Sequence, residues 1–347
     1  MSAPAKPLTT SAPVSSCRPA GARSLWSSCD SLDRLTLAYL ALLNSLILIF
    51  PGSLPMAGSL FTAHLLIAAG VVSLAAAARR WSSPGLHFFR HWSPLLLFLF
   101  FFEELGRLVR LVHPGWFDRY LLAFDYALFG FQPALVLQRF ASPWLNDAMQ
   151  FAYFTYYLYP LVLGAWFSFH RRFLELRFLM LASAMAYYPG YICAIFLPIE
   201  GPYHTLAARF SGPLQGGPVT ALMDWIERFG RVHGAAFPSA HVSGATVAVL
   251  CSWYFSGRSD PRKTETAGLP ASAAPLLVPV FPRLLFWLFL PFYFLLLVAT
   301  VYGRYHYVAD VFAGLLAGSL GFLLARWLSP PIPARFPGAN PSLASFG

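Results

Sequence analysis

Long stretches without charged side chains are the feature that most constrains the fold of this chain. Residues 35–78 contain no Asp, Glu, Lys or Arg over 44 positions, and a Pro-Gly-Ser-Leu-Pro turn at 51–55 divides them in two. A helix needs about 20 apolar residues to cross the hydrocarbon core of a bilayer, so this stretch suffices for two spans. Further apolar runs cover 148–169, 178–199, 232–257, 284–303 and 305–325, and a weaker candidate at 91–112 carries four charges in its second half.

The composition supports the same fold class. Hydrophobic residues make up 57% of the chain and charged residues only 11%, against roughly a quarter charged in soluble domains. We therefore predict an all-α, polytopic membrane helix bundle of about eight transmembrane helices. The expected organisation is a disordered cytoplasmic tail at 1–33, two N-terminal transmembrane helices within 34–92, a six-helix membrane domain at 93–328 and a Pro-rich tail at 329–347.

The distribution of Lys and Arg predicts the orientation. With eight spans and a cytoplasmic N-terminus, the cytoplasmic segments hold 16 of the 24 basic residues, as the positive-inside rule requires. The net charge of +10 is then mostly a topological bias. A nucleic-acid partner is not expected, because no basic face stands apart from the membrane.

Two histidine motifs interrupt the apolar stretches. Phe-Pro-Ser-Ala-His ends at His241, and His-Tyr-Val-Ala-Asp runs from His306 to Asp310, 65 residues later. Ionisable groups at membrane depth are costly unless they are paired or functional. Four residues on a helix would put His306 and Asp310 on one face, so the carboxylate would hold one imidazole nitrogen and leave the other free as a nucleophile or base. His241, at the start of another helix, would supply the acid. We therefore expect a membrane enzyme.

Two segments between the spans carry interfacial patterns. Apolar residues in 219–229 fall on one helical face and charged residues largely on the other, which is typical of a helix lying on the membrane surface. The segment 113–147 mixes Trp, Tyr and Phe with prolines and scattered charges, as in an interfacial aromatic belt. Loops that merely cover helix ends are an equally good interpretation of both.

The two histidine motifs resemble the second and third signatures of the type 2 phosphatidic acid phosphatase superfamily, and more closely its branch of inositolphosphorylceramide synthases and bacterial membrane relatives. The similarity extends to Asp125…Phe129-Gly130…Pro133 and to the Leu-Pro-Ile-Glu-Gly-Pro run at 197–202. It covers about residues 95–328 and implies a six-helix phosphatase-like core. The branch further implies an integral protein of the bacterial inner membrane. On the count of Lys and Arg given above, both histidine motifs lie at the non-cytoplasmic face of that membrane.

The resemblance also implies a mechanism and a set of site residues. His306 would attack phosphorus to form a phosphohistidine, Asp310 would orient it, and His241 would protonate the leaving alcohol. The substrate would be a membrane lipid phosphate or phosphodiester, with an alcohol as a possible acceptor. No cofactor or metal is implied, and no carboxylate cluster in the sequence suits one. The backbone at the start of a helix and a serine hydroxyl are suitable phosphate ligands. The expected substrate-binding residues are Ser239, Ala240, Arg304, Gly201 and Pro202.

The sequence also departs from the superfamily pattern. The first signature, with its Lys and Arg-Pro, is missing, since the only lysines are Lys6 and Lys263. Ala299 and Thr300 occupy the positions where the third signature usually opens with Ser-Arg, and Ala240 replaces a common glycine. These departures favour the phosphotransferase branch over the lipid phosphatases. They leave water and alcohol both open as acceptors.

Two alternatives remain on sequence grounds. Glu103-Glu104…Arg107 followed by the two histidine motifs echoes the signatures of the intramembrane CAAX-type proteases. In that family, however, the arginine stands one residue further from the glutamate pair. A non-enzymatic scaffold or transporter is the other alternative, and it leaves both histidine motifs unexplained.

Overall fold

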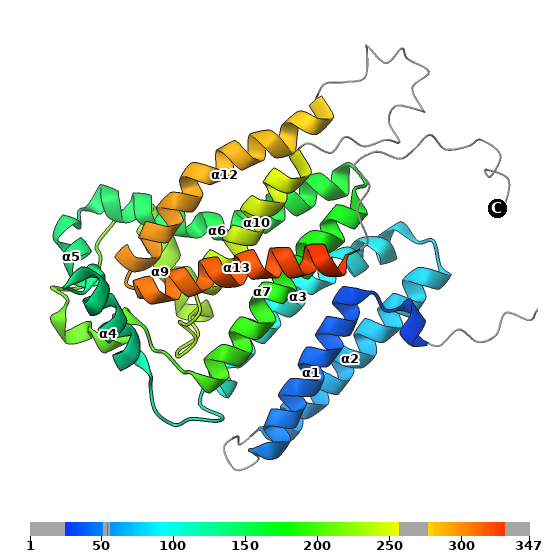
Figure 1. The fold of residues 1–347 in the computed structure, drawn as a ribbon, viewed down its shortest axis with the longest axis horizontal. Coiled ribbons are helices and arrows are strands. Elements are labelled where there is room, and N and C mark those ends of the chain that lie inside the picture. Colours follow the sequence, from blue (N-terminus) through cyan, green and yellow to red (C-terminus); the bar gives the residue numbers. More distant parts are fainter. Residues whose placement is uncertain (1–24, 51–53, 55, 257–276, 330–347) are drawn as a thin grey trace, which may run out of the picture.

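The computed structural model describes residues 25–50, 54, 56–256 and 277–329, and in these ranges it contains twelve α-helices and no β-strand (Figure 1). The predicted all-α class is confirmed. Eight helices have 17 residues or more and form the bundle. They are α1 (Ser31–Ile49), α2 (Ala57–Arg80), α3 (Pro84–Leu108), α6 (Pro143–Phe169), α7 (Phe173–Phe196), α10 (Ala240–Ser256), α12 (Leu277–Tyr302) and α13 (Val308–Leu328).

Five of these helices are long and apolar enough to cross a membrane by length and composition alone: α1, α2, α7, α12 from Pro282 onward, and α13. Their outward faces carry apolar side chains, such as Leu66 on α2 and Leu316 on α13, which are 69% and 60% exposed. Such faces are stable where lipid covers them. The protein is therefore an integral membrane protein.

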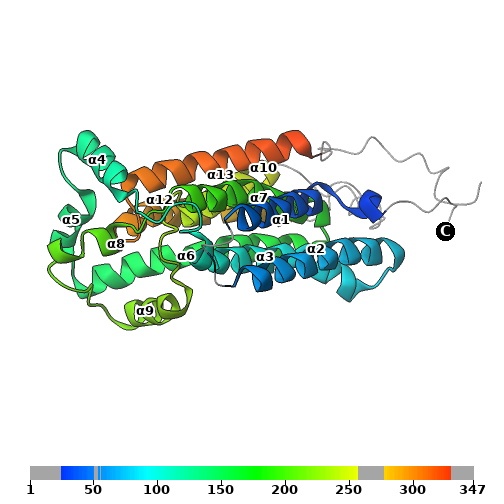
Figure 2. The same cartoon turned by 90° about the horizontal axis from the view of Figure 1, so that it is seen from below.

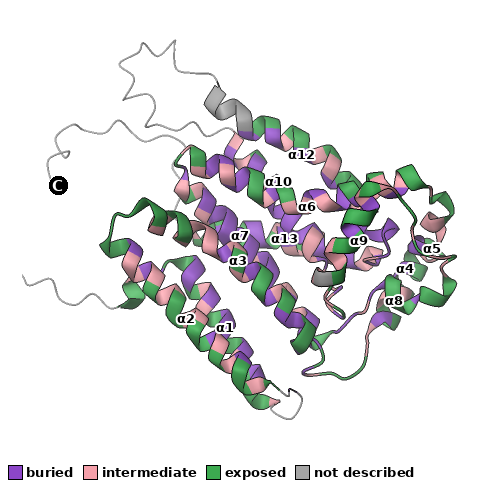
Figure 3. Cartoon of the chain, turned by 180° about the vertical axis from the view of Figure 1, so that it is seen from behind, coloured by how far each residue is buried: buried purple, intermediate pink, exposed green. Residues whose placement is uncertain are grey.

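Helix α7 lies at the centre of the bundle, as its burial shows (Figure 3). Fourteen of its 24 residues are buried, as expected for a helix that is apolar all round and surrounded by others. It packs against α13, α10, α3 and α1. The α1–α2 pair stands at one edge, and successive long helices run in alternating directions (Figure 1). The bundle therefore has two distinct ends.

Short helices gather at one of these ends (Figures 1 and 2). They are α4 (Asp118–Phe129), α5 (Pro133–Leu137) with the 3-10 turn η3 (Gln138–Phe140), α8 (Pro202–Thr205), η4 (Ala207–Arg209) and α9 (Pro218–Gly230). The predicted helix at 219–229 is confirmed as α9. Helix α4 ends at Gly130, whose φ of +75° suits a left-handed helix end. The chain then bends by 67° into Pro133–Phe140, so most of the expected belt at 113–147 is helical.

The opposite end is tied together by ion pairs. Asp30 caps α1 by accepting from the backbone N–H groups of Leu32 and Asp33. Arg177 of α7 contacts Asp30 at 2.7 Å and Asp33 at 3.0 Å, and Arg90 of α3 contacts Asp33 at 2.7 Å. The boundary predicted at residue 33 therefore lies inside α1, and Leu25–Ser28 forms a 3-10 turn. The rest of the predicted tail at 1–24 and the Pro-rich tail at 330–347 lie outside the described residues.

Candidate functional site

His306 and Asp310 meet at the start of α13. Tyr307 is the N-cap of this helix, and its backbone N–H donates to Asp310 Oδ2 at 2.7 Å. The same oxygen lies 3.4 Å from His306 Nδ1. The sequence predicted that His306 and Asp310 share one face of a helix, but His306 precedes α13. The capping turn folds His306 back toward the carboxylate. Asp310 is fully buried and His306 is 5% exposed, so the contact excludes water.

This contact is longer than a good hydrogen bond. His306 Nδ1 and Asp310 Oδ1 have no hydrogen-bond partner among the described residues. Catalytic contacts are often loose without substrate and tighten in the reacting complex. The arrangement leaves Nε2 of His306 as the nitrogen available for chemistry.

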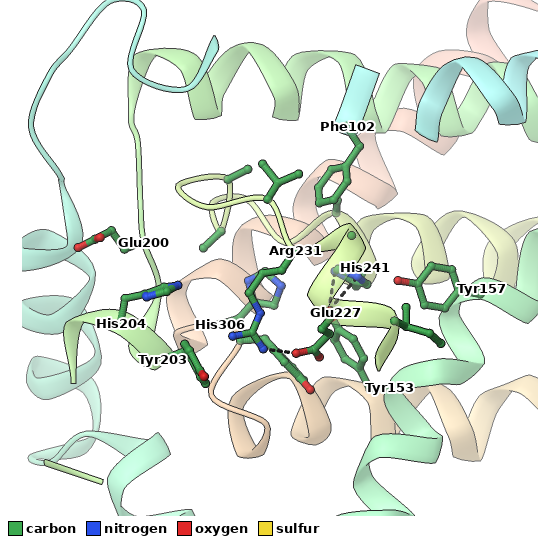
Figure 4. A pocket seen from close by; sticks show the side chains of 17 residues that line it. Phe102, Tyr153, Tyr157, Glu200, Tyr203, His204, Glu227, Arg231, His241 and His306 are labelled. Carbon is green, nitrogen blue, oxygen red and sulfur yellow. Dashed lines mark hydrogen bonds and ion pairs between the residues drawn. The ribbon is translucent and has the colours of Figure 1, made fainter. Parts of the chain in front are cut away.

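His241 lies opposite His306 (Figure 4). It is the second residue of α10, and the centres of the two imidazole rings are 5.8 Å apart. The hydroxyl of Tyr153 lies 2.9 Å from His241 Nε2, and the Tyr153 and Tyr156 rings pack at 4.6 and 4.5 Å from the imidazole. An aromatic wall from α6 therefore fixes the second histidine.

Small residues bring the two histidine-bearing segments together. A Cβ added to Gly314 of α13 would lie 2.7 Å from the Ser239 carbonyl oxygen, and one added to Gly318 would lie 2.5 Å from that of Ser243. This Gly-x-x-x-Gly pair is thus a close contact between the two helices. The backbone N–H of Ser239 also donates to the Asp310 carbonyl at 3.2 Å. The start of α10 is therefore fixed against that of α13.

Two aspartates of α4 hold the surrounding loops. Asp125 accepts from the first two N–H groups of α13, at 3.0 and 3.1 Å. Asp118 accepts from the backbone N–H groups of Glu200 and Gly201 and from the Tyr307 hydroxyl, each at 2.9 Å. A spacing of seven residues places both carboxylates on one face of α4. Helix α4 therefore positions the loop at 197–202 beside the His306 loop.

Both histidines line one cavity of about 90 Å³ (Figure 4). Glu227 and Arg231, from the C-terminal end of α9, enter it as an ion pair. The Arg231 guanidinium lies 4.1 Å from the centre of the Tyr203 ring. Burial raises the pKa of Glu227 above its ordinary value, while Arg231 opposes the rise. The cavity thus combines two imidazoles, a carboxylate and a guanidinium.

Of the substrate-binding residues expected from the sequence, some line the cavity and others do not. Ala240 lines the cavity. Ser239 is fully buried, and its Oγ accepts from the Val242 N–H at 3.4 Å, in the role of a helix cap. Gly201 and Pro202 do not line the cavity, although Glu200, Tyr203 and His204 beside them do. The φ of Gly201 is +87°, and a Cβ there would lie 2.8 Å from the Tyr305 carbonyl oxygen. Arg304 lines a neighbouring cavity instead.

Sequence reasoning missed the residues that the tertiary fold brings in. Glu227 and Arg231 belong to the charged face of the amphipathic segment and look like solvated side chains in the sequence. Tyr153 lies within an apolar span, where an aromatic side chain is ordinarily part of the packing. Asp125 belongs to a stretch that resembles the superfamily, and the seven-residue separation of Asp118 from it was a further signal of a shared role.

The glutamates of the protease alternative lie elsewhere. Neither Glu103 nor Glu104 lines the cavity that holds the histidines. Glu104 Oε1 lies 2.7 Å from Nε2 of the fully buried His64, whose Nδ1 lies 2.7 Å from Asn44 Oδ1. This contact joins α3 to α1 and α2. In the described part of the chain, no group of three or more His, Cys, Asp or Glu side chains is placed to hold a metal ion.

Residues 196–331 match the family model of the PAP2 superfamily. The matched segment contains His241, His306 and Asp310 and begins at the last residue of α7. No curated protein and no solved structure gives a match. The family match supports the superfamily resemblance found in the sequence, and with it a phosphatase or phosphotransferase activity of the kind that superfamily carries out on lipid phosphates.

Proposed function

We propose that this protein is a membrane phosphatase or phosphotransferase that acts on a lipid phosphate or phosphodiester through a phosphohistidine at His306. The observation that carries the proposal is the pairing of His306 with His241 in one cavity, 5.8 Å apart between ring centres, with Asp310 behind His306. A phosphorus atom between the rings would have a nucleophile on one side and a proton donor on the other. In-line displacement requires this order.

The proposed first step forms the bond between His306 Nε2 and phosphorus and breaks the bond between phosphorus and the ester oxygen. Asp310 stabilises the positive charge that develops on His306. The proton of His241 passes to the leaving oxygen, so that an alcohol departs. A bound phosphate supplies the negative charge that stabilises protonated His241, which has no carboxylate partner among the ion pairs of the described residues.

In the second step, water or an alcohol gives its proton to His241 and attacks the phosphohistidine, which restores His306.

Arg231 takes the role of the missing first-signature cations. It is the arginine that lines the cavity with both histidines, and a guanidinium suits the equatorial oxygens of a transferring phosphoryl group. Glu227 holds it in place. The absent first signature and the Ala299-Thr300 pair favour the inositolphosphorylceramide synthase-like branch, and either water or an alcohol can serve as the acceptor.

The orientation belongs to the same proposal. Arg79 and Arg80 lie in the last turn of α2, and Arg171 and Arg172 lie between α6 and α7. These helix ends stand at the end of the bundle opposite the short helices (Figure 1). By the positive-inside rule that end is cytoplasmic, so the proposed reaction occurs at the non-cytoplasmic face of the plasma membrane.

The test is a product analysis. The purified protein is incubated with phospholipids and isoprenoid phosphates, with and without alcohol acceptors, and the products are identified by mass spectrometry. We expect phosphate release or headgroup transfer that is lost in His306→Ala and retained in Glu104→Gln. Peptide cleavage that depends on Glu104 would instead support the protease alternative. No turnover of any phosphate ester by the folded protein would refute the proposal.

A leaving-group comparison tests His241 separately. General-acid catalysis matters most when the leaving oxygen is strongly basic. His241→Ala is therefore expected to lose much more activity on an alkyl phosphate than on a nitrophenyl phosphate. Equal losses on the two esters would show that His241 does not donate the proton.

A further inference from the structure

A second and larger cavity shares a wall with the one that holds the histidines. Tyr203, His204, Glu227, Arg231 and Tyr305 line both. The volumes are about 90 Å³ for the first and about 710 Å³ for the second, and ligand pockets commonly measure about 300–1,000 Å³. The first cavity is of the size of a phosphoryl group. The second has room for a polar group of many atoms.

Arg304 lines the second cavity and is 6% exposed. Its Nη1 donates to the Gly212 carbonyl at 2.7 Å, and its guanidinium lies 4.0 Å from the centre of the Phe210 ring. Nε is buried and has no hydrogen-bond partner. None of the ion pairs among the described residues includes Arg304. A buried cation without an anionic partner is costly, so this site is completed when an anion binds.

The backbone holds Arg304 in this position. Its φ is +66°, a left-handed conformation that is uncommon for residues other than glycine. Its N–H donates to the Val301 carbonyl at 3.1 Å, and its own carbonyl accepts from the Tyr203 N–H at 2.9 Å. The next two N–H groups, of Tyr305 and His306, both donate to the Thr300 carbonyl. The turn thus directs Arg304 and His306, two residues apart, to different cavities.

We infer that the second cavity binds a second anionic group, carried either by the headgroup of the lipid substrate or by the acceptor, with Arg304 as its principal ligand. The inference rests on the proposed function, because the site gains its meaning from a phosphoryl group held in the adjoining cavity. Arg228 lies at the exposed side of the same cavity and adds positive charge, which Asp224 there partly offsets. Arg231 is neutralised by Glu227. The preferred reactants therefore carry an anion beyond the phosphate that is transferred.

The first arm of the test compares two lipid monoesters with the same acyl chains. Phosphatidic acid has no second anionic group, whereas phosphatidylglycerol phosphate carries a phosphodiester beside the terminal phosphate. If the headgroup supplies the anion, the wild-type kcat/KM is higher for phosphatidylglycerol phosphate. Arg304→Gln then lowers this preference about tenfold, mainly through KM, as expected for the loss of one charge-assisted hydrogen bond.

The second arm keeps phosphatidic acid as donor and offers glycerol or glycerol 3-phosphate as acceptor. If the acceptor supplies the anion, glycerol 3-phosphate is the better acceptor, and Arg304→Gln removes the difference. Arg209→Gln is the matched control, because Arg209 is an exposed arginine of η4 that does not line the cavity. It should leave both preferences unchanged.

Arg228→Gln covers the case in which Arg304→Gln does not fold, and it should shift the same preference about threefold, as expected for an exposed charge. Equal rates for both members of each pair in the wild type would overturn the inference while leaving the proposed function intact. If Arg304→Gln lost equal activity on both members of a donor or acceptor pair, the inference would also be overturned. If Arg304→Gln does not fold, an Arg228→Gln variant with the same preference as the wild type would overturn it. Absence of turnover with every donor would overturn the proposed function as well.

Discussion

Replacing Gly314 with alanine should lower the activity strongly while the protein remains folded. The added Cβ would lie 2.7 Å from the Ser239 carbonyl oxygen and 2.9 Å from Val242 Cβ. A comfortable carbon–oxygen contact is about 3.3–3.6 Å, so α10 and α13 must separate locally by about 0.6–0.9 Å. Ser239 is two residues from His241, and Gly314 is four residues from Asp310. The separation therefore moves His241 away from His306.

The two consequences have different sizes. Overpacking costs about 1–3 kcal/mol, and replacing a glycine in a helix returns about 0.5–1 kcal/mol, so the net loss of stability is about 0–2.5 kcal/mol. A displacement of about 1 Å in a reacting geometry costs on the order of 100-fold in rate. We expect kcat to fall by about 10- to 100-fold while the variant remains folded.

The assay combines turnover of a lipid phosphate in detergent with thermal unfolding of the same sample. Gly70→Ala in α2 is the matched control, because no atom lies within 4 Å of its added Cβ. That variant should keep full activity and unfold at the same or a slightly higher temperature. Wild-type turnover in Gly314→Ala would refute the conclusion that this helix contact positions the two histidines.

Three further results are expected. Asp118→Asn should lower kcat about tenfold or more, because each hydrogen bond to a charged acceptor contributes about 1.5–3 kcal/mol. The variant weakens four such bonds, from Glu200, Gly201, Thr205 and Tyr307, and unchanged kinetics would contradict this role. Burial raises the pKa of Glu227 above 4.5, so ionisation of this carboxyl group opposes folding. The stability of the wild type relative to Glu227→Gln should therefore decline as pH rises from about 4.5 through the raised pKa. An unfolding temperature of the wild type that rises relative to that of the variant over this pH range would contradict the shift. Accessibility in intact cells tests the orientation, in a background from which Cys17 and Cys29 have been removed. Gln215→Cys, beside the cavity, should react with a membrane-impermeant thiol reagent, and Ser82→Cys, between α2 and α3, should not. The reverse pattern would place the active site in the cytoplasm.

The sequence predicted the bundle because membrane spans leave a local signal. A run without charges shows where a helix can cross a bilayer, and α2 follows such a run closely. Helix α13 follows the run at 305–325, in which Asp310 is the one charged residue. The third span was placed at 91–112, whereas α3 begins at Pro84. Arg90 interrupts the apolar run, but its guanidinium pairs with Asp33, so the helix continues through it. A charge that is neutralised by a neighbouring helix cannot be recognised from the run alone.

The site was predicted only in part because its members act over different sequence distances. His241, His306 and Asp310 stand in short motifs that a reader of the sequence can recognise. Arg231 and Glu227 reach the cavity only because α9 folds over it, and the hydrophobic pattern of that helix describes its surface without showing what its polar face contacts. Arg304 stands two residues from His306 in the sequence, yet the turn at its positive φ directs it into a separate cavity.

Detection of the phosphoenzyme tests the central claim most directly. A lipid substrate labelled in its phosphate is mixed with the protein and the reaction is quenched in alkali, in which a phosphoramidate is stable. We predict label on the protein that acid releases, that maps to His306 and that is absent from His306→Ala, while Arg209→Gln labels like the wild type. Normal turnover by His306→Ala, or label on any other residue, would contradict the account.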